Sequence, residues 1–162
     1  MPNAYMSEEG YIGIARQTAS GAGNYATPTA FMYVKSCDIG PETDLIIPDP
    51  EIGSSRDIVD AANGPVKYTG NIEFYLRPNS IGYFLLSAMG AVTSSGIAGQ
   101  TGAYGHTFTF QNNCIPLSIE KKIGDGMENL GYIDSKINSL HFECAAGEYV
   151  NGRAEVLSLD EV

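Results

Sequence analysis

Period-two alternation of apolar and polar residues recurs along this chain and limits its fold more than any other feature. In residues 71–77, NIEFYLR, every second side chain is apolar, and residues 137–144 and 152–159 show similar patterns. Successive side chains of a strand point to opposite faces, so this alternation predicts strands with one buried face. The chain also contains 19 Gly, 8 Pro and 10 Tyr, which favour turns and pleated surfaces. We therefore expect a mainly β fold.

Two predicted strands depart from this one-sided pattern. In GRAEVLSL, the side chains of Leu157 and Leu159 fall on the polar face. A β-bulge near Val156–Leu157, or burial on both faces, would explain this change of phase. TAFMYVK, residues 29–35, is apolar on both faces, which is typical of an interior strand.

One segment follows the spacing of a helix instead. At about residues 79–91, apolar side chains recur at i, i+3, i+4, i+7 and i+8, which places them on one face of an amphipathic helix. Gly90 can end this helix, because glycine readily adopts the left-handed conformation found at many helix C-termini. We expect the apolar face to pack on a sheet. The residues of this expected helix core are Ile81, Phe84, Leu85, Ala88 and Met89.

Two stretches lack a sustained period and are predicted to be loops. Residues 36–65 contain four prolines and several acids. A structureless loop of about 30 residues inside a compact domain is uncommon and is usually functional. Within it, the apolar run Leu45–Ile47 precedes Pro48, where continued strand pairing is difficult. The second stretch, TSSGIAGQTGAYG at residues 93–105, is glycine-rich and is expected to connect the helix to the next strand.

Composition argues against several classes of function. Nine Lys and Arg against nineteen Asp and Glu give a formal net charge of −10, whereas a phosphate-binding surface needs an excess of basic residues. We therefore do not expect sequence-specific binding of DNA or RNA. No apolar run reaches the roughly 18 residues of a membrane span, and the acidic start MPNAYMSEEG is unlike a signal peptide. Three widely separated cysteines favour a reduced cytosolic protein, and no membrane partner is expected.

The sequence does not group residues into a recognisable catalytic or metal site. It has no GxSxG, CxxC or HExxH motif, and nothing else combines a nucleophile with a base and an orienting acid. The glycines between residues 96 and 105 follow a predicted helix, whereas those of a phosphate-binding loop follow a strand. His106 and His141 are expected to hydrogen-bond at a sheet surface. We expect no catalytic, metal-binding or cofactor-binding residues, no cofactor, and a protein that is not an enzyme.

The stretch GNIEFYLRPNSIGYFLLSAMGAVTSSG, residues 70–96, resembles the tail tube proteins of long-tailed bacteriophages and related prophages. In that family a strand of the form G-x-I-E-x-x-L-R-P leads into a helix of the form S-I-G-x-x-L-x-x-A-x-G. Further similar segments follow in the family's order, so the resemblance spans roughly residues 8–158. Family members often have a second half of similar design. A chain that stops at VLSLDEV is therefore expected to be a short member or truncated at its C-terminus.

The resemblance implies both a fold and a function. It implies a β-sandwich or barrel with one packed helix at about 79–91, and residues 1–162 are expected to form one such domain. In the family, six copies form a ring, neighbouring sheets join into an inner β-barrel, and rings stack into a hollow conduit for DNA. The chain is thus expected to be a structural subunit of a virion tail, made and assembled in the host cytoplasm. Its expected partners are itself and other tail proteins, and DNA passes without sequence-specific binding.

Two sets of residues are candidates for roles in such a tube. Negative side chains on the polar faces of predicted strands would repel phosphate if they face the lumen, although they would equally suit an outward, solvated face. The 36–65 loop is a candidate for reaching a neighbouring ring, or it is a surface loop. The candidates for inter-ring contact are Leu45, Ile46, Ile47, Asp49 and Glu51. The candidates for the lumen are Glu73, Glu120 and Glu143.

Two alternative functions fit the same sequence. One is another ring-forming tail protein, or a tube or hub protein of a type VI secretion system, which share the sandwich-and-helix design. The other is a β-sandwich binding module of the carbohydrate-binding or adhesin type. That module would need aromatic side chains aligned on an exposed surface, and the ten tyrosines permit such a surface.

Overall fold

The computed structural model describes residues 10–47, 61–122 and 129–162. These residues are mainly in strands and include a single α-helix, as the sequence predicts. The elements are β1 (Tyr11–Arg16), the 3₁₀ turn η2 (Ala22–Asn24), β2 (Ala30–Met32), β3 (Ser36–Cys37), β4 (Gly40–Ile46), β5 (Ala62–Tyr75), α1 (Pro78–Met89), β6 (Gly90–Gly96), β7 (Tyr104–Phe110), β8 (Leu117–Lys122), β9 (Asn129–Glu143), β10 (Asn151–Ser158) and β11 (Asp160–Glu161).

The main sheet is antiparallel and has the strand order β2-β1-β8-β9-β10-β5-β3, with β4 paired to β5 and β11 paired to β9. Strand β9 belongs to both halves of this sheet. Its first part pairs with β8 and its second part pairs with β10. The two halves enclose one core, against which α1 packs. Its fully buried side chains include Ile12, Ile14, Ile72, Phe74, Phe84, Leu117, Ile119, Tyr132 and Val156.

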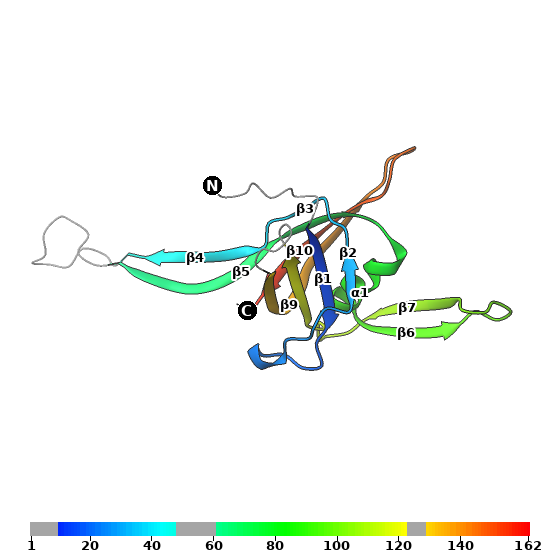
Figure 1. Cartoon of the computed structure of the whole chain (residues 1–162), viewed down its shortest axis with the longest axis horizontal. Helices are drawn as coiled ribbons and strands as arrows, with labels where there is room; N and C mark the ends of the chain where they lie inside the picture. Colours follow the sequence, from blue (N-terminus) through cyan, green and yellow to red (C-terminus); the bar gives the residue numbers. More distant parts are fainter. Residues whose placement is uncertain (1–9, 48–60, 123–128) are drawn as a thin grey trace, which may run out of the picture.

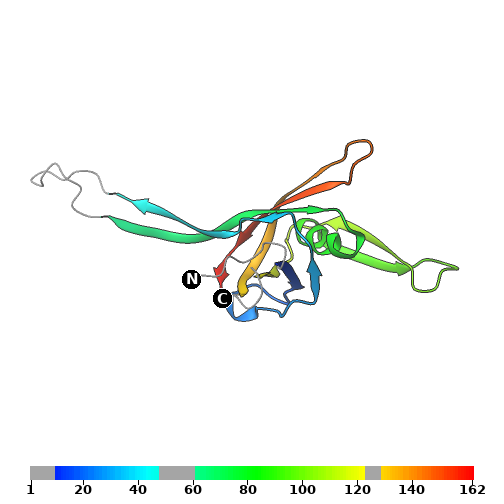
Figure 2. The ribbon, with the colours of Figure 1, turned by 45° about the horizontal axis from the view of Figure 1, so that its top comes forward.

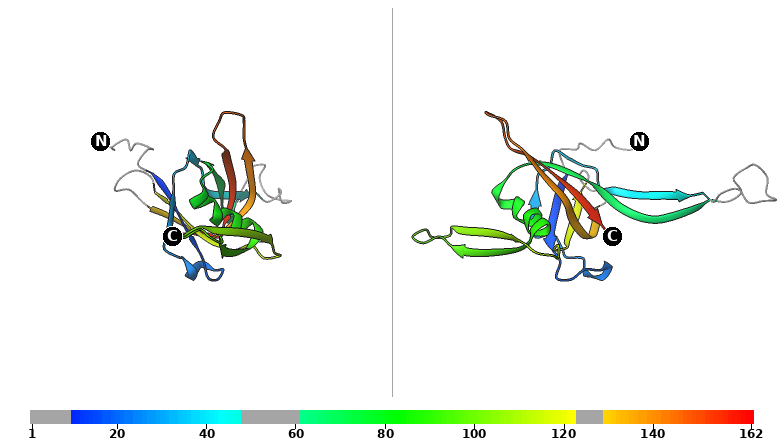
Figure 3. Two further views of the ribbon diagram at one scale, coloured as in Figure 1. Left: turned by 90° about the vertical axis from the view of Figure 1, so that its right-hand side faces the viewer. Right: turned by 180° about the vertical axis from the view of Figure 1, so that it is seen from behind.

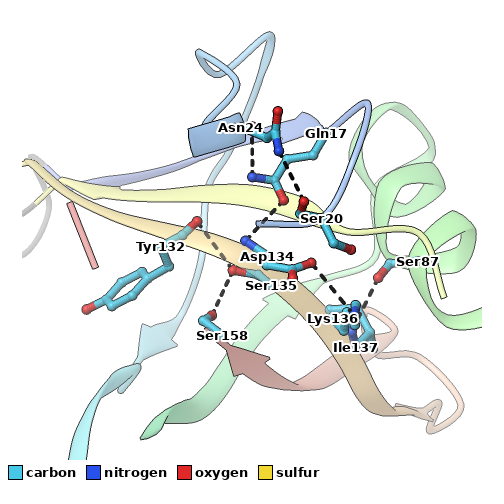
Figure 4. Close-up of polar contacts among 10 residues, drawn as sticks. All are labelled: Gln17, Ser20, Asn24, Ser87, Tyr132, Asp134, Ser135, Lys136, Ile137 and Ser158. Atoms are coloured by element: carbon cyan, nitrogen blue, oxygen red, sulfur yellow. Dashed lines mark hydrogen bonds and ion pairs between the residues drawn. The ribbon is translucent and has the colours of Figure 1, made fainter. Parts of the chain in front are cut away.

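The change of partner along β9 occurs at a bend stabilised by buried polar groups (Figure 4). Asp134 has a φ of 53°, in the left-handed region, and its backbone N–H donates to Oε1 of Gln17 at 3.0 Å. The Gln17 side chain is buried, and its Nε2 donates to the carbonyl of Asn24 at 2.9 Å. Nearby, the hydroxyls of Ser135 and Ser158 lie 2.7 Å apart. Gln17 therefore joins the η2 segment to the corner of the sheet.

The predicted helix is present at Pro78–Met89, within two residues of the expected bounds. It ends at Gly90, whose φ of 94° is the left-handed conformation that favours glycine. Phe84 is fully buried on the core, and Ile81 and Ala88 pack at its edge. Within the described ranges, no helix has the length and apolar character needed to span a membrane.

The buried face of α1 differs from the expected one. Leu85 and Met89 are only partly buried, whereas Ser80 and Ser87 are buried. The hydroxyl of Ser87 accepts a hydrogen bond from the backbone N–H of Ile137 at 3.3 Å. A small polar side chain of the helix thus provides the acceptor for a backbone donor of β9. Counting apolar residues alone misses such a contact and rotates the predicted face toward Leu85 and Met89.

The segment at 36–65 is not one long loop, which corrects the prediction. It contains β3, β4 and the start of β5, and β4 pairs with residues 62–69 of β5. We call residues 40–47 with 61–69 the arm. Most side chains along β4 are exposed, so the strand has no buried face and no alternating pattern could reveal it. Asp49 and Glu51 lie outside the described residues.

Two further segments also differ from the expected local structure. Residues 29–35 contain β2, which lies at an edge of the sheet, so their second apolar face is solvent-exposed: Phe31 is 61% exposed. Both ends of the glycine-rich stretch at 93–105 are paired, because β6 and β7 form a separate two-stranded hairpin. Only residues 97–103 connect these two strands.

A β-bulge is present in the β9–β10 pair, close to the predicted position. The register shifts between Glu155 and Val156, and the buried side chains of β10 keep their alternation. Val156 is fully buried, while Leu157 and Leu159 are exposed on the opposite face. The apparent change of phase thus reflects exposed leucines, and it does not require burial of both faces.

Hairpins project from this packed body in different directions. The arm and the β6–β7 hairpin extend toward opposite ends of the long axis (Figure 1). The β9–β10 hairpin leaves the body on another side, as the turned view shows (Figure 2). The view from behind gives the same arrangement (Figure 3). Much of the strand surface therefore lies outside the core of the single chain.

Phe84→Ala should lower the free energy of unfolding by about 3–5 kcal/mol, because it removes a fully buried ring that lies 5.3 Å from the Phe74 ring. Leu85→Ala, on the same helix, should cost clearly less because Leu85 is partly exposed. Urea denaturation followed by circular dichroism measures both losses. Equal losses would contradict the assigned face of α1.

Candidate assembly interfaces

The arm carries an apolar tip that the rest of the described chain leaves exposed. Leu45, Ile46 and Ile47 are 58%, 55% and 50% exposed, and Leu45 and Ile46 lie at the end of β4. The tip projects far from the core (Figure 1). Clustered apolar side chains on a projecting hairpin mark a surface for contact with another molecule. The structure thus places three of the five predicted inter-ring residues together.

The two ends of the main sheet are different strands. β2 forms one end of the strand order, whereas β3 and β4 lie at the other. An exposed strand edge presents unpaired N–H and C=O groups that can pair with another chain. Because the two edges differ, edge-to-edge addition of identical copies would be head-to-tail, which generates rings or filaments.

An apolar groove lies between α1 and the β6–β7 hairpin and has a volume of about 420 Å³. We call it the α1/β6–β7 groove. Ile81, Gly82 and Leu86 line its helix side, and Val92 and Phe108 line its hairpin side.

The chain has no Asp, Glu, Lys or Arg between residues 78 and 119, a range that includes α1 and the whole β6–β7 hairpin. This gap is unusual in a chain with 28 such residues, 9 basic and 19 acidic. Charged residues are depleted at the centres of protein interfaces. The lack of charged residues in this range is thus the sequence feature that indicates the groove. The periodicity of apolar residues does not indicate it.

Ser94 and His106 form a pair at the groove that resembles part of a hydrolase site. The Ser94 hydroxyl and Nδ1 of His106 are 2.7 Å apart across the hairpin. A nucleophilic serine needs its histidine to be oriented by a third, acidic group, and no acid lines this groove. Among the described residues, no group of three or more His, Cys, Asp or Glu is arranged to hold a metal ion.

Two of the three predicted lumen-facing acids share one polar hollow. Glu73 and Glu143 line a hollow of about 260 Å³ together with Lys35, His141 and Arg153. Across the strands Glu73 lies opposite Arg153, which lies opposite His141. The carboxylates of Glu73 and Glu143 therefore share this face of β5, β10 and β9 with the cations Lys35 and Arg153, so the face is of mixed charge.

The third predicted acid, Glu120, lies in a different environment on β8. Its carboxylate accepts hydrogen bonds from the hydroxyls of Tyr11, at 3.0 Å, and Tyr25, at 3.2 Å. Burial and the adjacent charge of Glu120 raise the pKa of Tyr25 to about 12. The hydrogen bond to Glu120 also raises the pKa of Tyr11. Glu120 thus fixes two tyrosines over β1 and β8 and does not belong to the polar hollow.

Exposed tyrosines gather near the end of β5 and are accompanied by cations. The rings of Tyr75 and Tyr149 are 5.6 Å apart and tilted by 54°. Lys35 lies over Tyr75, and Arg77 lies over Tyr33. Tyrosine with arginine is typical of the residues that dominate protein–protein contacts, whereas the tilted rings do not form a flat aromatic platform.

Comparisons with known proteins agree with this picture. The family model described as Phage tail tube protein matches residues 7–162. No curated protein sequence matches the chain significantly. The structure is similar to a chain of the anti-feeding prophage (AFP) baseplate, with a TM-score of 0.62, 8% identity and coverage of 100% of this chain and 96% of that one.

Two other solved structures show the same fold. A chain of the sheath–tube complex of the extracellular contractile injection system PVC has a TM-score of 0.58, 8% identity and coverage of 100% and 92%. The SPP1 tail tube has a TM-score of 0.54, 12% identity and coverage of 98% and 78%. At these identities, the likeness establishes the fold.

The pKa shifts predict a loss of stability at alkaline pH. Tyr25 and Tyr132 have pKa values of about 12 in the folded chain, against an ordinary value of 10.0. The folded state therefore holds these protons more tightly, and the resulting stabilisation is complete below pH 10 and is lost as the pH rises toward 12. Phenolate absorbance should show Tyr25 and Tyr132 titrating at higher pH than an ordinary tyrosine.

Glu120→Gln should lower the pKa of Tyr25 but leave that of Tyr132 unchanged, because burial and the charge of Glu161 are the main causes of the Tyr132 shift and Glu120 is not among them. The pKa of Tyr25 should remain above 10.0, since burial is the largest cause of its shift. An unchanged titration curve would contradict the Tyr25–Glu120 contact.

Proposed function

The chain belongs to the phage tail tube protein family, and from this premise we propose that its copies form hexameric rings that stack into a hollow conduit for DNA. The family makes it a structural component of a virion tail. The observation that carries the proposal is the pair of different open edges, β2 at one end of the sheet and β3 with β4 at the other. Pairing of one edge with the next copy's opposite edge satisfies both when a ring closes. Assembly would take place in the host cytoplasm.

In this assembly, the arm makes the contact between rings. Its length carries Leu45, Ile46 and Ile47 well away from the body of the subunit, and burial of such side chains favours association. Asp49 and Glu51 follow the tip in sequence and remain candidates for the same contact. The other partners of the tube are the remaining proteins of the tail, consistent with the sheath and baseplate assemblies that contain the similar structures.

We assign the polar face of β5, β10 and β9 to the lumen. Its mixed carboxylates and cations offer no continuous basic track, so the phosphates of a passing DNA find no strong site. A hexamer has a formal charge of 6 × −10 = −60, and its repulsion acts over about 8 Å at physiological salt. DNA would therefore slide through the conduit and would not bind to its wall.

A second candidate is a ring at the end of a tube. The similar structures include a baseplate chain and a PVC sheath/tube terminator, the latter with a TM-score of 0.56 and 10% identity. Such a protein would form rings without repeated stacking. Electron microscopy distinguishes the two, since a tube subunit gives long stacks and a terminal ring gives single rings.

Purified protein at high concentration should form rings and tubes visible by negative-stain microscopy. Ile46→Asp should leave the subunit folded, because Ile46 is exposed, but should block stacking by placing a charge in an apolar contact. Thr43→Asp adds the same charge to the same strand away from the tip and serves as the matched control. Normal tubes from Ile46→Asp would refute the role of the tip.

Replacing the two acids of the polar hollow should make the tube retain DNA. Tubes of the Glu73→Lys, Glu143→Lys variant, assembled with short duplex DNA, should hold it at low salt and release it as salt rises. Glu148→Lys with Asp160→Lys makes the same change of charge outside this face. Equal retention by both variants in a co-sedimentation assay would contradict the assignment of the lumen.

A further inference from the structure

The α1/β6–β7 groove has the chemistry of a contact surface but has no occupant within the described chain. It is apolar, open and about 420 Å³ in volume. It lies in the range 78–119, which contains no charged side chain although the chain as a whole carries −10. In a subunit that repels its own copies, a surface without charge is where copies can approach.

Gly82 is an independent sign that the groove must stay open. Glycine in the interior of a helix lowers helix stability relative to alanine, because it loses more conformational freedom on folding. A Cβ at Gly82 would find Phe108 Cζ at 3.9 Å as its nearest neighbour, an ordinary contact. Folding of the single chain therefore gives no steric reason for glycine at this position. Glycine keeps the helix side of the groove free of a side chain.

The arm tip is the matching surface elsewhere on the molecule. It is also apolar and exposed, and it projects toward the opposite end of the long axis from the β6–β7 hairpin (Figure 1). Two different, complementary surfaces on one chain are what a repeating head-to-tail contact requires. A groove-to-groove contact between two copies would leave both tips in water.

We propose that the arm tip of one copy, formed by Leu45, Ile46 and Ile47, docks in the α1/β6–β7 groove of a second copy. This proposal rests on the proposed function and names the receiving site of the contact between rings. Ile46 enters beside Gly82, between the helix and Phe108. The Ser94 hydroxyl and Nδ1 of His106 hydrogen-bond to each other at the groove, so these two atoms keep a partner when the tip docks.

A charge exchange tests the contact directly. Ile46→Lys and Gly82→Asp should each raise the concentration needed for tube assembly at least about tenfold, because each places an unpaired charge in an apolar contact. The double variant should recover most of this loss, because the new lysine of one copy meets the new aspartate of the next. Sedimentation measures the concentration for assembly, and circular dichroism verifies that each monomer is folded.

Gly105→Asp is the matched control. Gly105 lies on β7 outside the groove, and a Cβ there would meet only Ser95 O at 3.9 Å. This variant should assemble like the unmodified chain and should not restore Ile46→Lys. Gly82→Ala should fold at least as well as the unmodified chain. This variant shows whether replacing the glycine destabilises the helix, separately from the effect of a charge on docking.

Cross-linking provides a second measurement that does not depend on charge. With the exposed cysteines replaced by Cys114→Ser and Cys144→Ser, the pair Ile46→Cys and Gly82→Cys should give disulfide-linked chains of subunits in oxidised tubes. The pair Ile46→Cys and Gly105→Cys should give none.

The outcomes separate the docking proposal from the proposed function. If the unmodified chain forms no rings or tubes, both fail. If it forms tubes but Gly82→Asp assembles normally and no cross-link forms, the docking is overturned while the tube function stands. If Gly82→Asp blocks assembly but the charge-exchange double variant shows no recovery and the Ile46→Cys, Gly82→Cys pair forms no cross-link, the groove receives a different surface and the assignment to the arm is wrong.

Discussion

The structure depends on strand β9 changing partners at a single corner. The bend at Asp134 takes a left-handed conformation that L-residues adopt at a cost of about 1–2 kcal/mol. The hydrogen bonds of the buried Gln17 to Asp134 and to Asn24 offset this cost and fix the corner to the η2 segment (Figure 4). Because β9 bends there, the β1–β8 half and the β10–β5 half close on one core, and α1 packs against that same strand.

The same geometry explains why so much of the chain lies outside its own core. β5 and β9 are long strands whose inner parts carry core side chains such as Phe74 and Tyr132, while their outer parts continue into hairpins (Figure 1). An isolated two-stranded hairpin is marginally stable in water, because it has no buried face. The projecting hairpins are therefore best understood as parts of a larger assembly, in which neighbouring copies supply the missing packing.

The sequence pattern predicts secondary structure well where side chains are buried by other residues of the same chain. Alternation in residues 71–75 and 152–156 predicted the central strands, and the helix was found within two residues because Gly90 marks its end. Exposed strand segments, such as β4 and residues 93–96 of β6, carry no periodic signal, so the sequence pattern predicts loops there. Register and face escaped prediction for a related reason: they depend on partners far apart in sequence, as Glu120 and Tyr25 show.

The distribution of charge supplies the complementary information. A formal net charge of −10 opposes association of single subunits, since like charges repel. A subunit of this kind can still assemble if its contact surfaces exclude charge, so that apolar burial outweighs the remaining repulsion once contact is made. Both the arm tip and the α1/β6–β7 groove satisfy this condition, and the arm and the β6–β7 hairpin extend toward opposite ends of the long axis. In the tube that we propose, a head-to-tail order would then follow from the placement of charge along the chain as much as from its strands.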